Sequence, residues 1–237
     1  MDDLSRTQGF ALIAEMDSAR NLLAYGTRVI RTAQFIETTR DPILTMLSIG
    51  VEKLLKMALG LTILNETGSW PSRTVMQNEF RHGSQRMDGA LRAKLRLGIG
   101  GRDGTPYITG ILQAVEDDPI WPAMLATLDM YGRSGRFYNL DLLGEARQST
   151  ESPTAFWNDL EQAVLASDPE LRAQMNAAMN GGSNDDWEAF YSAVNNAIAD
   201  SVYRWWEMIA ILGRHGVLGE TGTTFGWEVH PTAVGRQ

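Results

Sequence analysis

Residues 187–212, WEAFYSAVNNAIADSVYRWWEMIAIL, form the longest regularly patterned stretch of this 237-residue chain. Their large apolar side chains recur at intervals of three and four residues, the spacing that places side chains on one face of an α-helix. A helix over these residues would be about 37 Å long, because each residue adds about 1.5 Å. We therefore predict a long C-terminal helix that crosses a whole domain. Its buried face consists of Trp187, Tyr191, Val194, Ile198, Val202, Trp205, Ile209 and Leu212.

The same spacing continues toward the N-terminus, where four dipeptides mark helix starts. Each places a capping side chain before a proline at the first helical position, where the missing N–H of proline costs nothing. The four dipeptides are Asp41-Pro42, Asp118-Pro119, Ser152-Pro153 and Asp168-Pro169. Besides the helices that start there, the periodicity predicts helical structure over residues 4–39 (two helices, or one bent at Gly26), 72–97 and 107–117.

These helices predict an all-α fold, an antiparallel helical bundle of six to eight helices with the long C-terminal helix packed along it. We expect residues 1–145 to form the bundle and residues 146–218 to form an additional helical lobe packed on it. Residues 219–237 are rich in glycine and threonine and have no helical period, so we expect an extended or flexible tail.

The composition excludes several classes of chemistry. The chain has no cysteine, which excludes disulfides, thiolate metal sites and a cysteine nucleophile. Its three histidines have no ligand spacing, so we expect no metal and no cofactor. The N-terminus is acidic and unlike a signal peptide, and no apolar stretch approaches the roughly 20 residues that span a bilayer. We therefore expect a cytoplasmic protein without a membrane partner.

Charge is unevenly distributed along the chain, whose total is −8 from 21 basic and 29 acidic residues. Residues 73–102, here called the basic stretch, have a net charge of +5, whereas residues 151–200 have a net charge of −8. Such a separation can steer an anionic partner to one face of a protein. The alternative is that the basic stretch faces acidic helices or solvent.

Five residues are candidate ligand contacts. Lys53 and Lys56 lie on the helix that starts at Asp41, where they could meet an anionic ligand or merely cover apolar surface. Arg133, Arg136 and Asn139 lie between glycines and tyrosines, in a segment that suits phosphate recognition and base stacking. The alternative for this second group is an interhelical corner in which the arginines satisfy carbonyl groups.

Three pieces of the sequence resemble the HEPN superfamily of helical bundles, over roughly residues 18–145. The fragment SIGVEKLLK at 48–56 resembles the second helix of that family, Arg81-His82 resembles a helix start after its loop, and GRFY at 135–138 resembles the opening of a later helix. The resemblance implies a dimerising bundle with nucleic-acid or nucleotide-linked biology, such as defence or toxin–antitoxin systems. Family members that cleave RNA carry an Arg and then, after four to six intervening residues, a His, whereas the corresponding positions after Arg136 are Asp141, Leu142 and Leu143 in this chain. The resemblance therefore implies a non-catalytic member, with Arg136 and His82 as the residues that catalysis would need.

Three functions stay open at this point. The first is a HEPN-like protein that binds nucleic acid or another anionic ligand. The second is a protein-interaction or oligomeric scaffold protein that uses the acidic lobe and the tryptophan-bearing helix. Trp205 and Trp206 point about 100° apart on that helix, so we expect one in the core and the other at a partner surface. The third is a metal-free enzyme such as a degenerate RNase. For all three we expect a homo-oligomer, most simply a dimer.

Overall fold

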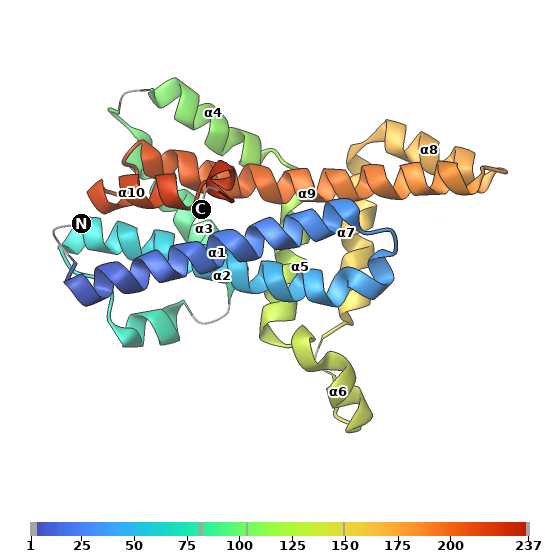
Figure 1. Ribbon diagram of the computed structural model, residues 1–237, viewed down its shortest axis with the longest axis horizontal. Helices are drawn as coiled ribbons and strands as arrows, with labels where there is room; N and C mark the ends of the chain where they lie inside the picture. Colours follow the sequence, from blue (N-terminus) through green and yellow to red (C-terminus); the bar gives the residue numbers. More distant parts are fainter. Residues whose placement is uncertain (1–3, 81–82, 103, 149, 236–237) are drawn as a thin grey trace. The chain divides into compact units, whose positions relative to one another are not determined.

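The computed structural model describes residues 4–80, 83–102, 104–148 and 150–235, and the fold is all-α (Figure 1). Of the described residues 81% are helical, and no strand occurs among them, which confirms the predicted fold class. The long predicted helix is present and extends over 31 residues. The α-helices are α1 (Arg6–Thr32), α2 (Ile36–Thr67), α3 (Ser84–Ile99), α4 (Thr105–Glu116), α5 (Trp121–Arg133), α6 (Tyr138–Leu143), α7 (Pro153–Ser167), α8 (Pro169–Met179), α9 (Asn184–Arg214) and α10 (Glu220–Glu228). Three shorter helical segments are η1 (Val75–Glu79), η2 (Gly135–Phe137) and η3 (Pro231–Ala233).

The chain forms two compact units, and each is built from separate segments of sequence. Unit 1 comprises Met1–Ala24, Ile49–Asp117 and Arg204–Gln237, and unit 2 comprises Tyr25–Ser48 and Asp118–Tyr203. Three of the four boundaries fall inside α1, α2 and α9, and the fourth falls between α4 and α5, so none lies near the expected position 145. Segments distant in the sequence therefore meet within each unit, an arrangement that local periodicity does not encode.

The expected extended tail is wrong, because residues 220–228 form the helix α10 of unit 1. Phe225 is fully buried there. Gly226 allows the close approach of α10 to α9, since a Cβ atom at this position would lie 2.4 Å from the backbone oxygen of Ala210. Glycine and threonine are poor helix formers, so packing against α9, not propensity, stabilises this helix.

The same packing corrects the expectation for the adjacent tryptophans. Both Trp205 and Trp206 are buried, with 0% and 1% of their surface exposed. Trp205 Nε1 donates a hydrogen bond of 2.7 Å to the buried carboxylate of Asp88, and Trp206 Nε1 donates one of 2.6 Å to the carbonyl of Val229. Neither indole offers a surface to a partner, because α3 and the segment that follows α10 supply their hydrogen-bond acceptors.

In unit 2, two of the predicted helix starts are confirmed by their hydrogen bonds. Ser152 accepts from the amide of Ala155 at the start of α7, and Asp168 accepts from the amides of Glu170 and Leu171 at the start of α8. These caps satisfy N–H groups that the first turn of a helix otherwise leaves unpaired.

The helix starts predicted at Asp41 and over residues 72–97 differ from the structure. The helix α2 begins at Ile36 and contains Pro42, while Asp41 accepts a hydrogen bond of 2.8 Å from the hydroxyl of Tyr131 instead of capping. Between residues 72 and 97 the helical structure is divided into η1 and α3. Gly26 is not a bend, because α1 runs through it, and a Cβ atom there would overlap Leu47 at 2.5 Å.

Candidate functional site

The five candidate ligand contacts do not form one site. Lys53 and Lys56 lie on the part of α2 that belongs to unit 1, whereas Arg133, Arg136 and Asn139 lie at the end of α5, in η2 and in α6 of unit 2. The sixth candidate, His82, lies outside the described residues. The two groups must therefore be considered separately.

Lys53 and Lys56 border a cavity of about 260 Å³ in unit 1, here called the Lys53 cavity. Its lining comes from the start of α1, the middle of α2 and the segment around η1, and it is largely apolar. The apolar lining includes Leu4, Leu12, Met57, Trp70 and Met76. Trp70 also packs against α2 at Gly60, where a Cβ atom would lie 2.6 Å from the indole ring.

The two lysines are already ion-paired at the edge of this cavity. Lys53 Nζ donates to Glu15 Oε2 at 2.6 Å and to Ser18 Oγ at 3.1 Å. Lys56 Nζ donates to Glu52 Oε1 at 2.7 Å, one turn earlier on the same helix. The cavity therefore has an apolar interior and an edge where two ammonium groups are balanced by two carboxylates.

Three of the seven basic residues in the basic stretch form ion pairs with described residues inside unit 1. Arg92 contacts the buried Asp88 at 2.8 Å, Lys94 contacts Glu66 at 2.6 Å, and Arg96 pairs with Glu116. These pairs favour the interpretation of the basic stretch as a face that meets acidic helices.

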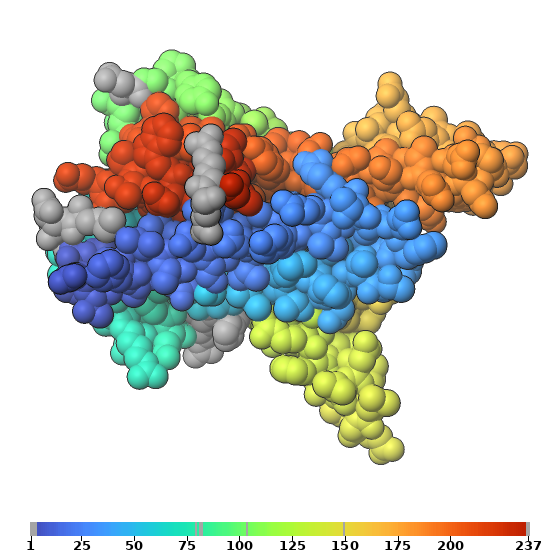
Figure 2. Space-filling model, in the orientation of Figure 1, coloured from blue at the N-terminus to red at the C-terminus, as the bar shows by residue number. Residues whose placement is uncertain are grey.

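The second group of candidates occupies the corner segment, residues 131–139, of unit 2. Arg133 pairs with Asp129 at 2.6 Å although 60% of its side chain is exposed, and Arg136 and Asn139 are also exposed. The buried Tyr131 fixes the corner, because its hydroxyl donates to Asp41 Oδ1 and bonds Thr45 Oγ1, both at 2.8 Å. Burial is the main cause that raises the pKa of Tyr131 above its ordinary value. The following helix α6 projects away from α5 and α7 (Figures 1 and 2).

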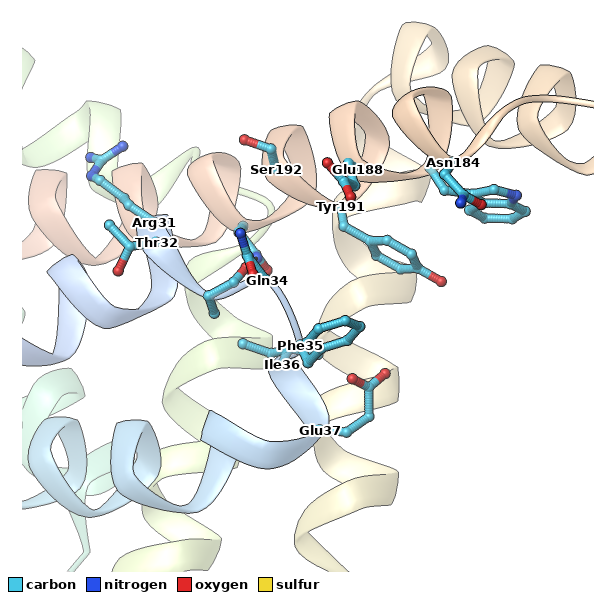
Figure 3. A pocket seen from close by; sticks show the side chains of 13 residues that line it. Arg31, Thr32, Gln34, Phe35, Ile36, Glu37, Asn184, Glu188, Tyr191 and Ser192 are labelled. Atoms are coloured by element: carbon cyan, nitrogen blue, oxygen red, sulfur yellow. The ribbon is translucent and has the colours of Figure 1, made fainter.

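A larger cavity, of about 630 Å³, lies between the α1–α2 connection and the first half of α9, all within unit 2 (Figure 3). We call it the α9 cavity. Phe35 and Glu37 border it from the connection and from the start of α2, and Glu188 and Tyr191 border it from α9. Sequence analysis assigned no site here, because it placed Tyr191 on the buried face of the long helix. The structure leaves 44% of Tyr191 and 69% of Phe35 exposed.

Aromatic rings form a fixed wall along the α9 side of this cavity. The rings of Trp187 and Tyr191 are nearly parallel, with an interplanar angle of 25° and centroids 5.7 Å apart. The buried ring of Phe190 packs against both, with its centroid 6.0 Å from that of Trp187 and 5.3 Å from that of Tyr191. The four-residue spacing of Trp187 and Tyr191 predicted that they share a helix face, because residues i and i+4 are neighbours on a helix, but that face was assigned to the core.

Near this wall the pKa values of two acidic residues are shifted, that of Asp186 by capping at the start of α9 and that of Glu161 by burial on α7. Ser183 and Asp186 cap α9 reciprocally, with Ser183 N donating to Asp186 Oδ2 at 2.7 Å, and this backbone bond holds the pKa of Asp186 below its ordinary value. On α7, burial raises the pKa of Glu161, and the nearby charge of Glu37 raises it further, while the hydrogen bond from Trp157 lowers it.

The whole net charge of the protein belongs to unit 2. Its segments contain 7 basic and 15 acidic residues, a net charge of −8, whereas unit 1 contains 14 of each. Unit 2 is therefore a poor long-range attractor for anions and a good one for cations.

No cluster of three or more metal-ligating side chains occurs in the described ranges. No helix of the described chain has both the length and the apolar character that a membrane span requires. Comparison of the chain with protein-family models, curated protein sequences and solved structures gave no match.

Proposed function

We propose that this protein is a helical binding protein whose unit 1 takes a small anionic ligand with an apolar body, such as an aliphatic carboxylate. The observation that carries the proposal is the Lys53 cavity, which combines an apolar interior with two lysines at its edge. An aliphatic chain placed in this interior loses contact with water, which contributes about 25 cal/mol per Å² of buried apolar surface. A carboxylate at its end would then lie beside Lys53 or Lys56.

The existing ion pairs do not oppose such a ligand. Glu15 is 52% exposed, and an ion pair at such a surface contributes about 0–1 kcal/mol, so its displacement costs little. Lys53 is less exposed, at 30%, and an anion that reaches it from the cavity side is better shielded from water and salt than one on an open surface. When the ligand carboxylate replaces Glu15, the ammonium group of Lys53 is paired with a carboxylate both before and after the ligand binds.

Calorimetric titration with octanoate, with 1-octanol as the neutral comparison, tests this proposal. We expect Lys53→Met to weaken octanoate binding about tenfold, equivalent to about 1.4 kcal/mol, and to leave octanol binding unchanged. We expect Glu15→Gln to strengthen octanoate binding, because it removes the competing carboxylate.

The matched control is the ion pair of Lys94 with Glu66, which has the same length as that of Lys53 with Glu15 and similar exposure, 34% and 52%. It is in the same unit but does not border the cavity. Lys94→Met and Glu66→Gln should leave binding unchanged. Equal effects of Lys53→Met and Lys94→Met, or equal affinities for octanoate and octanol, would contradict the proposal.

A second candidate function is the binding of single-stranded nucleic acid at the corner segment. The exposed side chains of Arg136 and Phe137, adjacent in the chain, favour it, because they combine a phosphate contact with a stacking surface. The resemblance of residues 18–145 to HEPN proteins supports it, whereas the net charge of unit 2 opposes it.

Salt-dependent binding of a short RNA distinguishes this second candidate. Each phosphate contact contributes about −0.7 to a plot of log affinity against log salt concentration for single strands. Arg133→Ala with Arg136→Ala should therefore make the slope shallower by about one to two units. The control pair Arg28→Ala with Arg147→Ala removes the same charge from unit 2 and should change the slope less. Equal changes in the two double variants would eliminate the corner as a binding site.

A further inference from the structure

The α9 cavity has features that neither the anion site nor the corner segment explains. Phe35 exposes 69% of its surface on the α1–α2 connection, and it lines the same cavity as the paired rings of Trp187 and Tyr191 on α9. Figure 3 shows Phe35 and Tyr191 on these two elements. Large aromatic side chains normally bury most of their area, so their gathering around an open cavity indicates a binding surface. The volume of about 630 Å³ lies in the range of small-molecule sites.

The polar part of the lining determines the sign of the ligand charge. Glu37 and Glu188 contribute carboxylates to the cavity. Arg31 is the basic residue of the described lining, and its guanidinium is already paired with Asp200 at 2.5 Å and bonded to Asn196 at 3.2 Å. An anion entering the cavity would meet two carboxylates and a neutralised arginine, whereas a cation would meet two carboxylates and aromatic faces.

The rings and the carboxylates favour the same class of ligand. The face of an aromatic ring attracts a cation, most strongly at Trp, and the attraction increases where water is excluded. The field of the unit acts in the same direction, because unit 2 has a net charge of −8.

We infer that the α9 cavity binds a small organic cation, such as a quaternary ammonium compound, with its charged group against Trp187, Tyr191 and Phe35 and near Glu37 and Glu188. This site is separate from the anion site proposed for unit 1 and does not depend on it. Small inorganic cations would gain less from the rings, because they hold their hydration shells strongly.

Calorimetric titration of the full chain with benzyltrimethylammonium and with choline tests the inference. The neutral isostere of choline, 3,3-dimethyl-1-butanol, isolates the contribution of charge, and benzenesulfonate tests an anion of similar ring size. We expect both cations to bind, the neutral isostere to bind at least tenfold more weakly than choline, and benzenesulfonate not to bind. Equal affinity for choline and its isostere, or tighter binding of benzenesulfonate, would overturn the inference.

Matched variants locate the site. Glu37→Gln and Asp159→Asn each remove one charge from unit 2, but Asp159 is an exposed residue of α7 outside the cavity lining. We expect Glu37→Gln to weaken binding of benzyltrimethylammonium several-fold and Asp159→Asn to change it by less than twofold. Equal effects would mean that only the overall charge of the unit attracts the cation.

The aromatic wall is tested in the same way. We expect Tyr191→Leu to weaken binding about five- to tenfold, in line with the loss of one cation–π contact, and Tyr191→Phe to retain most of the affinity because the ring remains. The control Trp227→Leu removes an exposed indole of α10 in unit 1 and should have no effect. Unchanged affinity in Tyr191→Leu, with circular dichroism like that of the wild type, would exclude this wall from the site.

Discussion

Glu161 is a carboxyl group whose surroundings disfavour its charge. Burial raises its pKa first, the charge of Glu37 raises it further, and the hydrogen bond of 2.9 Å from Trp157 Nε1 opposes them. Because the folded state holds this proton more tightly than the unfolded state, the group contributes stability at low pH. That contribution is lost as pH rises from the ordinary value of about 4.5 through the raised folded value.

We therefore predict that Glu161→Gln changes the pH dependence of unfolding. The amide oxygen can still accept from Trp157, whereas the charge is gone, so the variant should gain stability relative to the wild type as pH rises above about 4.5. Urea unfolding at several values between pH 4 and pH 7 measures this difference. The control Asp159→Asn removes the same charge from an exposed position of α7 and so separates the effect of charge number from that of the buried site. A parallel profile for Glu161→Gln would show that Glu161 has the same pKa in both states.

At the scale of elements, the contact between α9 and α10 depends on the absence of a side chain. A Cβ atom at Gly226 would lie 2.4 Å from both the oxygen of Ala210 and the amide nitrogen of Arg214. Both neighbours are backbone atoms, so the clash cannot be relieved by a change of rotamer. The contact also covers Trp206, whose indole donates to Val229 just after α10.

We predict that Gly226→Ala lowers the free energy of unfolding by about 1–3 kcal/mol, the usual cost of overpacking. Gly110→Ala is the matched control, because Gly110 is an exposed residue of α4 with no atom within 4 Å of a built Cβ. Alanine there should raise stability by about 0.5–1 kcal/mol, since glycine in a helix interior is costly. Chemical denaturation measures the free energy of unfolding of both variants, and we expect it to fall for Gly226→Ala and to rise for Gly110→Ala. A stabilising effect at Gly226 would mean that α10 does not pack closely against α9.

At the scale of the whole molecule, the exposed apolar surface differs from the one expected. One of Trp205 and Trp206 was expected to contribute to it, but both are buried, whereas η2 and α6 expose Phe137, Leu140 and Leu143. These side chains lie on the segment that stands out from α5 and α7 (Figure 2). An exposed apolar cluster of this kind is typical of an interaction surface.

We predict that the protein elutes near twice its mass of 26.2 kDa and that α6 lies in the contact between the two copies. Leu140→Glu with Leu143→Glu should shift elution toward the monomer, because each added carboxylate would be buried in the contact. The control Leu97→Glu changes an equally exposed leucine of α3 in unit 1 and should leave the mass unchanged. Light scattering coupled to size-exclusion chromatography measures the mass of the wild type and of each variant. A monomer at tens of micromolar for the wild type would exclude this form of assembly.

Sequence patterns alone predicted the all-α class, a long helix over residues 187–212 that lies within α9, and the starts of α7 and α8 at Ser152 and Asp168. These features depend on short windows, because helical spacing and capping involve residues no more than about four positions apart. The sequence also singled out Lys53 and Lys56, which the structure places at a cavity.

Only the tertiary structure decided which segments meet. Phe35 and Tyr191 border one cavity although more than 150 positions separate them, and no local pattern relates them. The helix α10 forms from weak helix formers because burial against α9 outweighs their propensity. Partition of the charge is also a tertiary property, since unit 1 becomes neutral only when residues 1–24, with a net charge of −2, combine with residues 49–117, with a net charge of +2. Helix propensities, which differ by a few tenths of a kcal/mol per residue, depend on local sequence and so can be estimated from it. Cavities arise from packing between residues that are distant in the sequence, and helix propensities contain no information about that packing.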